Sequence, residues 1–219
     1  MTIRTVVFDI GGILEVIPGG GDPTALFPEM MARWDARLGL PQGELYRRLT
    51  EMSERLLSAG KDGGIGTLSE AEWREEIRLV TGWDQPLLDD FMQDFWDVYC
   101  GNPNPELAEY LGGLRPRYQT ALLSNSFDGA RREEEARLHL SEIADLIIYS
   151  HEVGVAKPDP RIYAITCERL GVRPEEIVFL DDVERNVVAA NDYGIHAILF
   201  RDNAQAIADI QATLDAHSA

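Results

Sequence analysis

The sequence predicts an α/β protein built on a doubly wound parallel sheet, with a helical domain inserted after the first strand. Three observations lead to this fold class. Five short runs are continuously apolar, as strands covered on both faces are, and helical stretches separate the last four. More than 100 residues lie between the first two runs, too many for one crossover helix. The runs are residues 5–8, 120–123, 146–149, 177–180 and 197–200.

The long interval after the first run has the apolar periodicity of helices. Ser69 and Glu72 form a capping-box pattern that begins another helix. We expect these helices to form a cap domain over residues 16–99. Its four tryptophans are expected in the cap and hinge core, and most of its arginines are expected to pair with acidic side chains. The periodic stretches are residues 29–38, 44–57 and 86–99.

The remaining chain is expected to form the α/β core. Under this division the core comprises residues 1–15 and 100–219. Gly171 and Gly194 are typical helix ends. His151 and Glu152 are expected to be loop residues without ligand roles. The core helices are expected after Lys157-Pro158, on the apolar run from Ile162 to Leu170, and over 187–193 and 203–217.

Composition and charge exclude several functional classes. A chain of 219 residues that is 45% hydrophobic can bury a full core. A net charge of −18 argues against binding nucleic acid or an anionic membrane. No apolar stretch approaches the ~18 to 20 residues that span a membrane, and no secretory signal is apparent, so we expect a cytoplasmic protein. Cys100 and Cys167 are far apart and are expected to be reduced thiols.

Polar side chains follow four of the five predicted strands, at the edge where open α/β sheets bind ligands. Each has an ordinary structural alternative. Residues 124–126 can cap a helix, and a lysine before proline, such as Lys157, is most often solvated. Two adjacent carboxylates after a buried strand, however, repel each other unless a cation or donors lie nearby. Their joint occurrence favours a functional site. The residues are Asp9, 124–125, 150–151 and 181–182.

Four segments together resemble the four motifs of the haloacid dehalogenase superfamily of hydrolases. The resemblance covers about residues 1–15 and 100–200. It implies a Rossmann-like core with the family's small helical cap, and the Asp-x-Gly-Gly first motif occurs in phosphatase-like subfamilies. The segments, in chain order, are Phe8-Asp9-Ile10-Gly11-Gly12-Ile13-Leu14, Leu123-Ser124-Asn125-Ser126, Val155-Ala156-Lys157-Pro158-Asp159-Pro160 and Phe179-Leu180-Asp181-Asp182.

The resemblance implies a nucleophile and a metal site. Asp9 is the implied nucleophile, which attacks phosphorus or carbon to form an aspartyl intermediate. The implied cofactor is Mg²⁺, held by the side chain of Asp9, the main-chain carbonyl of Gly11 and the side chain of Asp182. Asp181 is implied to bind the ion as well, either directly or through a water molecule. Hard oxygen ligands of this kind suit Mg²⁺.

The resemblance also implies how a phosphoryl group is bound. Ser124 donates its hydroxyl to a phosphoryl oxygen, and Lys157 neutralises charge on nucleophile and substrate. Both are therefore candidate catalytic residues. Asn125 and the main chain at Ile10 and Gly11 complete the implied substrate-binding set. The expected partner is a small phosphorylated molecule.

Gly11 departs from the phosphatase pattern, in which an Asp at this position is the general acid and base. Such assistance is typically worth ~10²- to 10⁴-fold, so slow turnover is expected unless another group, such as Glu15, substitutes. The dehalogenase branch also lacks this Asp and needs no metal, but tends not to carry paired acids in its last motif. Three hypotheses stay open: a Mg²⁺-dependent phosphatase, which the paired acids favour, a 2-haloacid dehalogenase-like hydrolase, and a catalytically weak binding or regulatory protein.

Overall fold

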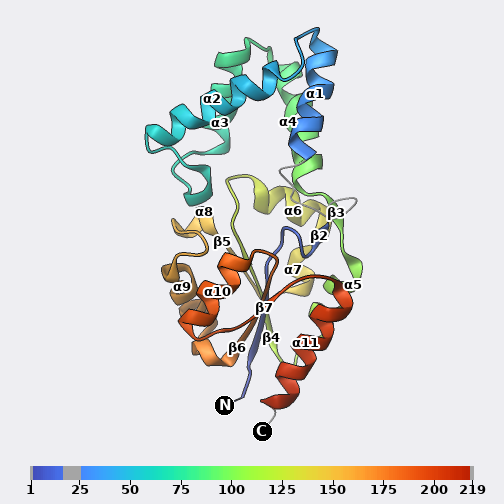
Figure 1. Ribbon diagram of the computed structural model, residues 1–219, viewed down its shortest axis with the longest axis vertical. Coiled ribbons are helices and arrows are strands. Elements are labelled where there is room, and N and C mark those ends of the chain that lie inside the picture. The colour runs from blue at the N-terminus through green and yellow to red at the C-terminus, as the bar shows by residue number, and fades with distance from the viewer. Residues whose placement is uncertain (1, 17–25, 218–219) are drawn as a thin grey trace.

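A five-stranded parallel sheet forms the centre of the computed structural model, which describes residues 2–16 and 26–217 (Figure 1). The strand order is β5-β4-β1-β6-β7, with β1 in the middle. The predicted doubly wound parallel sheet is confirmed, and each predicted strand end lies within one residue of the observed one. The strands are β1 (Thr5–Phe8), β4 (Gln119–Ser124), β5 (Leu146–Tyr149), β6 (Ile177–Asp181) and β7 (His196–Leu199).

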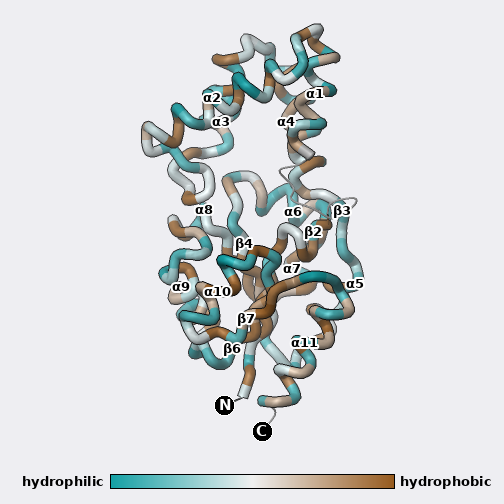
Figure 2. The backbone as a smooth tube through the Cα atoms, viewed as in Figure 1, coloured by the Kyte–Doolittle hydropathy of each residue, from teal (hydrophilic) through white to brown (hydrophobic). Residues whose placement is uncertain are grey.

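Side chains of β1 alternate between two hydrophobic clusters. Val6 and Phe8 belong to the cluster on one face of the sheet, and Val7 belongs to the cluster on the other. Because both faces are covered, every residue of this strand is apolar or buried. In Figure 2 the strands are accordingly the brown centre of the lower half of the molecule.

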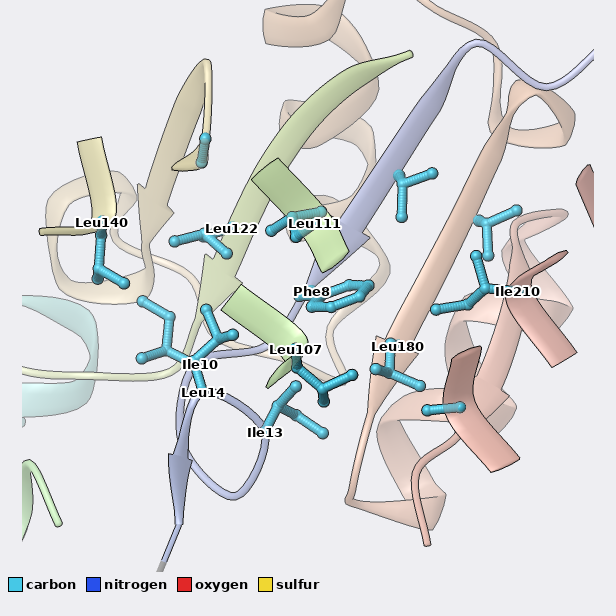
Figure 3. Packing of buried hydrophobic residues seen from close by; sticks show 14 of the residues in the cluster. Phe8, Ile10, Ile13, Leu14, Leu107, Leu111, Leu122, Leu140, Leu180 and Ile210 are labelled. Atoms are coloured by element: carbon cyan, nitrogen blue, oxygen red, sulfur yellow. The ribbon is translucent and has the colours of Figure 1, made fainter. Parts of the chain in front are cut away.

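Helices cover both faces of the sheet. On one face, Phe8 packs with Leu107, Leu111 and Ile210, which come from the covering helices (Figure 3). On the other face, Ile162 of one covering helix packs with sheet residues such as Val7 and with Ala190 of a second helix. The first face carries α5 (Pro105–Gly113), α7 (Leu140–Ile143) and α11 (Asn203–Ala216), and the second carries α9 (Pro160–Leu170) and α10 (Glu184–Tyr193).

The chain between β1 and β4 forms a helical layer beyond the carboxyl end of the sheet, opposite to both termini (Figure 1). The capping box of Ser69 and Glu72 is present. The cap boundary at residues 16–99 stays a prediction, and residues 17–25 of it lie outside the described residues. The elements are α1 (Leu26–Leu38), α2 (Glu44–Ser58), the 3₁₀ helix η2 (Gly63–Ile65), α3 (Glu70–Thr81) and α4 (Gln85–Tyr99).

A small antiparallel pair, which the sequence did not indicate, joins the two crossings between core and cap. It consists of β2 (Glu15–Val16) and β3 (Asn102–Pro103). Gly101 is needed beside this pair, because its φ is +53° and an added β-carbon would lie 3.0 Å from the carbonyl oxygen of Val16. These strands are two residues long, too short for an alternating pattern to reveal.

One expected loop is helical. His151 and Glu152 lie in α8 (Ser150–Val153), so the prediction of a loop there was wrong. The reason is tertiary, because this turn packs against η2 of the cap. The approach is so close that a β-carbon on Gly66 would lie 2.1 Å from the main-chain oxygen of His151. The core also includes α6 (Ala130–Leu138) and the 3₁₀ turn η3 (Pro174–Glu176).

Cys100 and Cys167 are both buried and form no disulfide, as expected. Across residues 2–16 and 26–217, no helix combines the length and apolar character needed to cross a membrane.

Candidate active site

The predicted site residues converge because their strands are neighbours. β1 pairs with β4 on one side and with β6 on the other. Asp9 directly follows β1, Ser124 ends β4 and Asp181 ends β6. The carboxyl ends of parallel strands meet at one edge of a sheet, so these three side chains share the edge that faces the cap.

Lys157 connects two of the acidic residues. Its Nζ lies 2.8 Å from Oδ2 of Asp9 and 2.7 Å from Oδ2 of Asp181. The lysine side chain is only 1% exposed, so the alternative of a solvated loop lysine is wrong. Asn125 fixes the main chain of this lysine, because its Oδ1 accepts from the Lys157 N–H and its Nδ2 donates to the Lys157 carbonyl, each at 2.8 Å. The ammonium group is thereby held between two carboxylates.

Asp181 is held by several donors, whereas Asp182 is exposed. The Asp181 carboxylate accepts from the main chain of Val183 at 2.8 Å and from Nδ2 of Asn186 at 3.1 and 3.2 Å. The carboxylate of Asp182 lies over Gly12, where an added β-carbon would be 2.2 Å from Oδ2. Gly12 also has a φ of +75°. A glycine is therefore required for both its backbone conformation and the approach of Asp182.

Burial and the charge of Lys157 act in opposite directions on the pKa of Asp9. Burial raises the pKa of Asp9 to about 7, although Lys157 works in the opposite direction. Burial by itself lowers the pKa of Lys157, but Asp9 and Asp181 outweigh it, so that pKa is raised and the lysine stays charged. The main-chain N–H of Ile10 donates to Oδ1 of Asp9 at 2.7 Å, which fixes the carboxylate further.

The carboxylates at this edge fit a divalent cation. Oxygen atoms of Asp9, Asp181 and Asp182 all lie within 4.8 Å of one another. A set made only of carboxylate oxygens suits a hard ion such as Mg²⁺ better than a soft one. A cation here also relieves the repulsion among these three carboxylates, of which Lys157 contacts only Asp9 and Asp181.

The loop after β4 is fixed by hydroxyl groups. The main-chain N–H of Ser126 donates to Oγ of Ser150 at 2.9 Å, and Oγ of Ser126 lies 2.6 Å from the hydroxyl of Tyr99. Ser124 itself is buried beside the sheet. Residues 124–126 do not cap the next helix, because α6 begins only at Ala130 and has Gly129 as its N-cap. The helix-cap alternative for this segment is therefore wrong.

Gly11 leaves open space, and Glu15 lies nearby in the chain. No heavy atom is within 4 Å of the position that a β-carbon on Gly11 would take. Glu15 is buried in β2. Burial, with a further contribution from Glu134, raises the pKa of Glu15 well above its usual range. A raised pKa favours the protonated carboxyl, which is the form that a general acid needs.

Two residues of the site escaped the sequence analysis. Asn186 holds Asp181 from the first turn of α10, and a polar side chain beside Val187 and Val188 was the one available signal. Glu134 is buried on α6 and accepts from the hydroxyl of Tyr149. The sequence offered no signal for it, because it lies in a run of glutamates that is otherwise typical of a solvated helix face.

Comparison with known proteins shows the family of this chain. A protein-family model described as "Hydrolase: haloacid dehalogenase-like hydrolase" matches residues 3–194. "Bifunctional epoxide hydrolase 2" of Mus musculus is 35% identical over 219 residues, which cover 96% of this chain and 39% of that protein. The chain thus spans about two fifths of the length of this relative.

Other relatives carry two different activities in their names. "Phosphorylated carbohydrates phosphatase" of Thermotoga maritima is 28% identical over 199 residues, covering 90% of this chain and 84% of that protein. "(S)-2-haloacid dehalogenase 1" of Pseudomonas sp. (strain CBS-3) is 33% identical over 95 residues, covering 43% of this chain and 42% of that protein.

Solved structures share the fold. An HAD family enzyme from Bacteroides thetaiotaomicron, in complex with magnesium and inorganic phosphate, superposes with a TM-score of 0.67 at 20% identity. The match covers 91% of this chain and 94% of that one. At this identity the likeness establishes the α/β architecture and leaves the substrate open.

Proposed function

This chain belongs to the haloacid dehalogenase-like hydrolases, and on that premise we propose that it is a Mg²⁺-dependent phosphatase acting on a small phosphorylated metabolite. One observation carries the proposal. Lys157 lies buried between Asp9 and Asp181, beside a third carboxylate at Asp182. A haloacid presents a neutral carbon to its nucleophile, whereas a phosphoryl group presents negative charge. A cluster that unites a lysine with a place for a divalent cation suits the second substrate better.

The chain's carboxylates provide the place for the ion. Asp9 and Asp182 would hold it with their side chains, and Gly11 would do so with its main-chain carbonyl. Asp181 already accepts from three donors, so its main task is to orient Lys157. When bound, Mg²⁺ neutralises charge on the phosphoryl oxygens and keeps Asp9 ionised.

The chain's own residues account for the first chemical step. The Asp9 carboxylate attacks phosphorus, forming a bond between its oxygen and phosphorus while the bond to the leaving oxygen breaks. Lys157 and the hydroxyl of Ser124 bind the phosphoryl oxygens, and both are buried, so their interactions are not weakened by bulk water. Asn125 acts as a positioning residue for Lys157.

In the second step water attacks the phosphorus of the aspartyl phosphate, the bond between phosphorus and the Asp9 oxygen breaks, and phosphate leaves while the proton of the water passes to solvent. In the first step the leaving oxygen of the substrate must gain a proton, and Gly11 has none to give. Glu15, whose pKa burial raises well above its usual range, is the candidate donor. Substrates with weakly basic leaving groups depend least on this step, so they are expected to react fastest.

A second candidate is a 2-haloacid dehalogenase-like hydrolase. Gly11 favours it, because halide leaves without protonation, and a relative bears that name. The cluster of three carboxylates counts against the dehalogenase. Such a cluster suits a divalent cation, and the displacement of a halide does not need one.

The test is a panel of phosphorylated metabolites assayed for phosphate release with and without Mg²⁺, beside a 2-haloacid control. We expect Mg²⁺-dependent phosphate release and no halide release. The Asp9→Asn variant should lose at least about 10⁴-fold in activity while its circular dichroism spectrum stays that of the wild type. Halide release that resists a chelator would instead establish the dehalogenase. If neither phosphate nor halide is released but Mg²⁺ raises the melting temperature, the result would favour a binding protein.

A further inference from the structure

Two adjoining hollows lie where the cap meets the core. One has a volume of about 240 Å³ and the other of about 360 Å³. Their walls come from α1, α2, α3, α4, the segment around η2 and the loop that follows β4. They are continuous, because the same five residues line both: Ser53, Leu57, Trp73, Phe95 and Phe127.

Phe127 connects this cavity to the candidate active site. It follows Ser124 by three residues in the chain, yet its ring packs among aromatic rings of the cap. Its centroid lies 5.9 Å from that of Trp73, 5.6 Å from Phe95 and 5.1 Å from Tyr99. The loop that binds the phosphoryl group in the proposed function therefore also forms a wall of the cavity.

The wall offers few hydrogen bonds to a ligand. Lys61 lines the smaller hollow but is paired with Glu72 at 2.7 Å, and Glu70 is paired with Arg132 at 3.1 Å. The rest of the smaller hollow is lined by aliphatic and aromatic groups, glycines and two serines. A polyol carries a hydroxyl on nearly every carbon. In such a cavity each hydroxyl would lose its hydrogen bonds to water and gain none from the wall.

We propose that this cavity binds the leaving group of the substrate and that this leaving group is an apolar aromatic ring system. The inference rests on the proposed phosphatase function and specifies its substrate class as aryl phosphate monoesters. An apolar cavity of about 150 Å³ holds benzene in another protein, so 240 Å³ accommodates a larger ring. Gly11 agrees independently, since an aryl oxide leaves without the proton that an alkoxide requires.

The test separates ring binding from leaving-group basicity. 2-Naphthyl phosphate and phenyl phosphate have leaving groups of similar basicity but different apolar area. With Mg²⁺ present, kcat/KM should favour the naphthyl ester by about 10-fold, the smaller end of what an apolar pocket discriminates. Ribitol 5-phosphate and glycerol phosphate represent polyol leaving groups and should react more slowly than either.

A matched pair of variants locates the effect. Leu57 lines both hollows and is 56% exposed, whereas Leu79 is 62% exposed on α3 and lines neither. Each lies in the last turns of a cap helix, so replacement by Asn should leave the fold intact. Leu57→Asn should reduce the preference for naphthyl over phenyl by about fourfold, which is the factor that one buried methylene group is worth. Leu79→Asn should leave the preference unchanged.

Each outcome decides one proposal. If no monoester releases phosphate, the phosphatase function itself is wrong. If phosphate is released but the polyol esters are preferred, or naphthyl and phenyl esters react equally, the phosphatase function stands and the aromatic leaving group is overturned. Equal effects of Leu57→Asn and Leu79→Asn would also overturn the assignment of this cavity.

Discussion

Charged side chains are used in opposite ways at the carboxyl edge of the sheet and on the surface of the cap. At the sheet edge, the Lys157 side chain is 1% exposed and contacts two carboxylates. On α2 of the cap, the Arg47 side chain is 54% exposed and contacts Glu44 at 2.8 Å and Glu51 at 2.7 Å. The distances are nearly the same, so geometry alone does not distinguish the two groups.

Exposure to solvent distinguishes the ion pairs of Lys157 from those of Arg47. A buried ion pair has lost its hydration and depends wholly on its partners, whereas water and salt replace an exposed pair at little cost. A buried charge cluster is an inefficient source of stability, because apolar residues of similar size often stabilise a fold as well. The buried cluster is therefore best explained by chemistry, and the surface pairs by solubility and helix support.

Replacing the buried lysine should have the largest effect. We expect Lys157→Met to reduce activity by at least about 10³-fold, because the phosphoryl group loses a preorganised positive charge. It should also lower the free energy of unfolding by about 3 kcal/mol, since two buried carboxylates lose their counter-charge. Phosphate release and urea denaturation measure the two effects. An unchanged unfolding free energy would mean that water already hydrates the cluster.

Restoring the absent carboxylate should have the next largest effect. Gly11→Asp has open space for the new side chain, and we expect kcat/KM for alkyl phosphates to rise at least about 10-fold. Aryl phosphates should change little, because they need no proton on the leaving oxygen. The control is Gly12→Ala, which should lose activity through contact with Asp182. A rise for aryl and alkyl esters alike would count against the missing-acid explanation.

Glu134 is buried like Asp9 and Asp181 but does not contact Lys157, and it therefore offers a third comparison. Burial raises the pKa of Glu134 to about 8, against about 4.3 in an unfolded chain. Its stabilising contribution is therefore complete below about pH 4.3 and is lost as the pH rises to about 8. Relative to Glu134→Gln, the wild type should lose at least about 1.4 kcal/mol of unfolding free energy between about pH 5 and pH 8, the value of one pKa unit. Denaturation at several pH values measures this, with the exposed Glu109→Gln as a control that should show no such trend.

The smallest effect is expected on the cap surface. Arg47→Ala should leave activity and melting temperature within experimental error of the wild type, because its two ion pairs are exposed. Thermal unfolding at low and high salt is the measurement. A marked loss of stability at low salt would show that the α2 pairs act as a network, and would weaken the contrast with Lys157.

The sequence was sufficient for the features that depend on local pattern. Continuous apolar runs identified all five parallel strands, and polar residues at their carboxyl ends identified Asp9, Ser124 and the pair at 181–182. Periodicity identified the cap helices and the capping box of Ser69. These features are encoded by neighbouring residues, because strand and helix each impose a fixed repeat on burial.

Other features depend on residues that are distant in the chain. The strands β2 and β3 meet across 86 intervening positions from Glu15 to Asn102, and each is too short for a pattern of its own. Asn186 holds Asp181 only because α10 turns back over β6. The helical turn at His151 is stabilised by its packing against η2 of the cap.

The sequence by itself determined the fold class, the motif residues and the absence of an acid at Gly11. Only the tertiary structure decided that Lys157 is buried between Asp9 and Asp181, that Asn125 holds its main chain, and that Phe127, in the loop after β4, lines a hollow together with aromatic residues of the cap. The physical reason is that burial is a property of packing between distant segments. A lysine in a Lys-Pro turn is exposed or enclosed according to what folds over it, and its own neighbours in the chain carry no record of that.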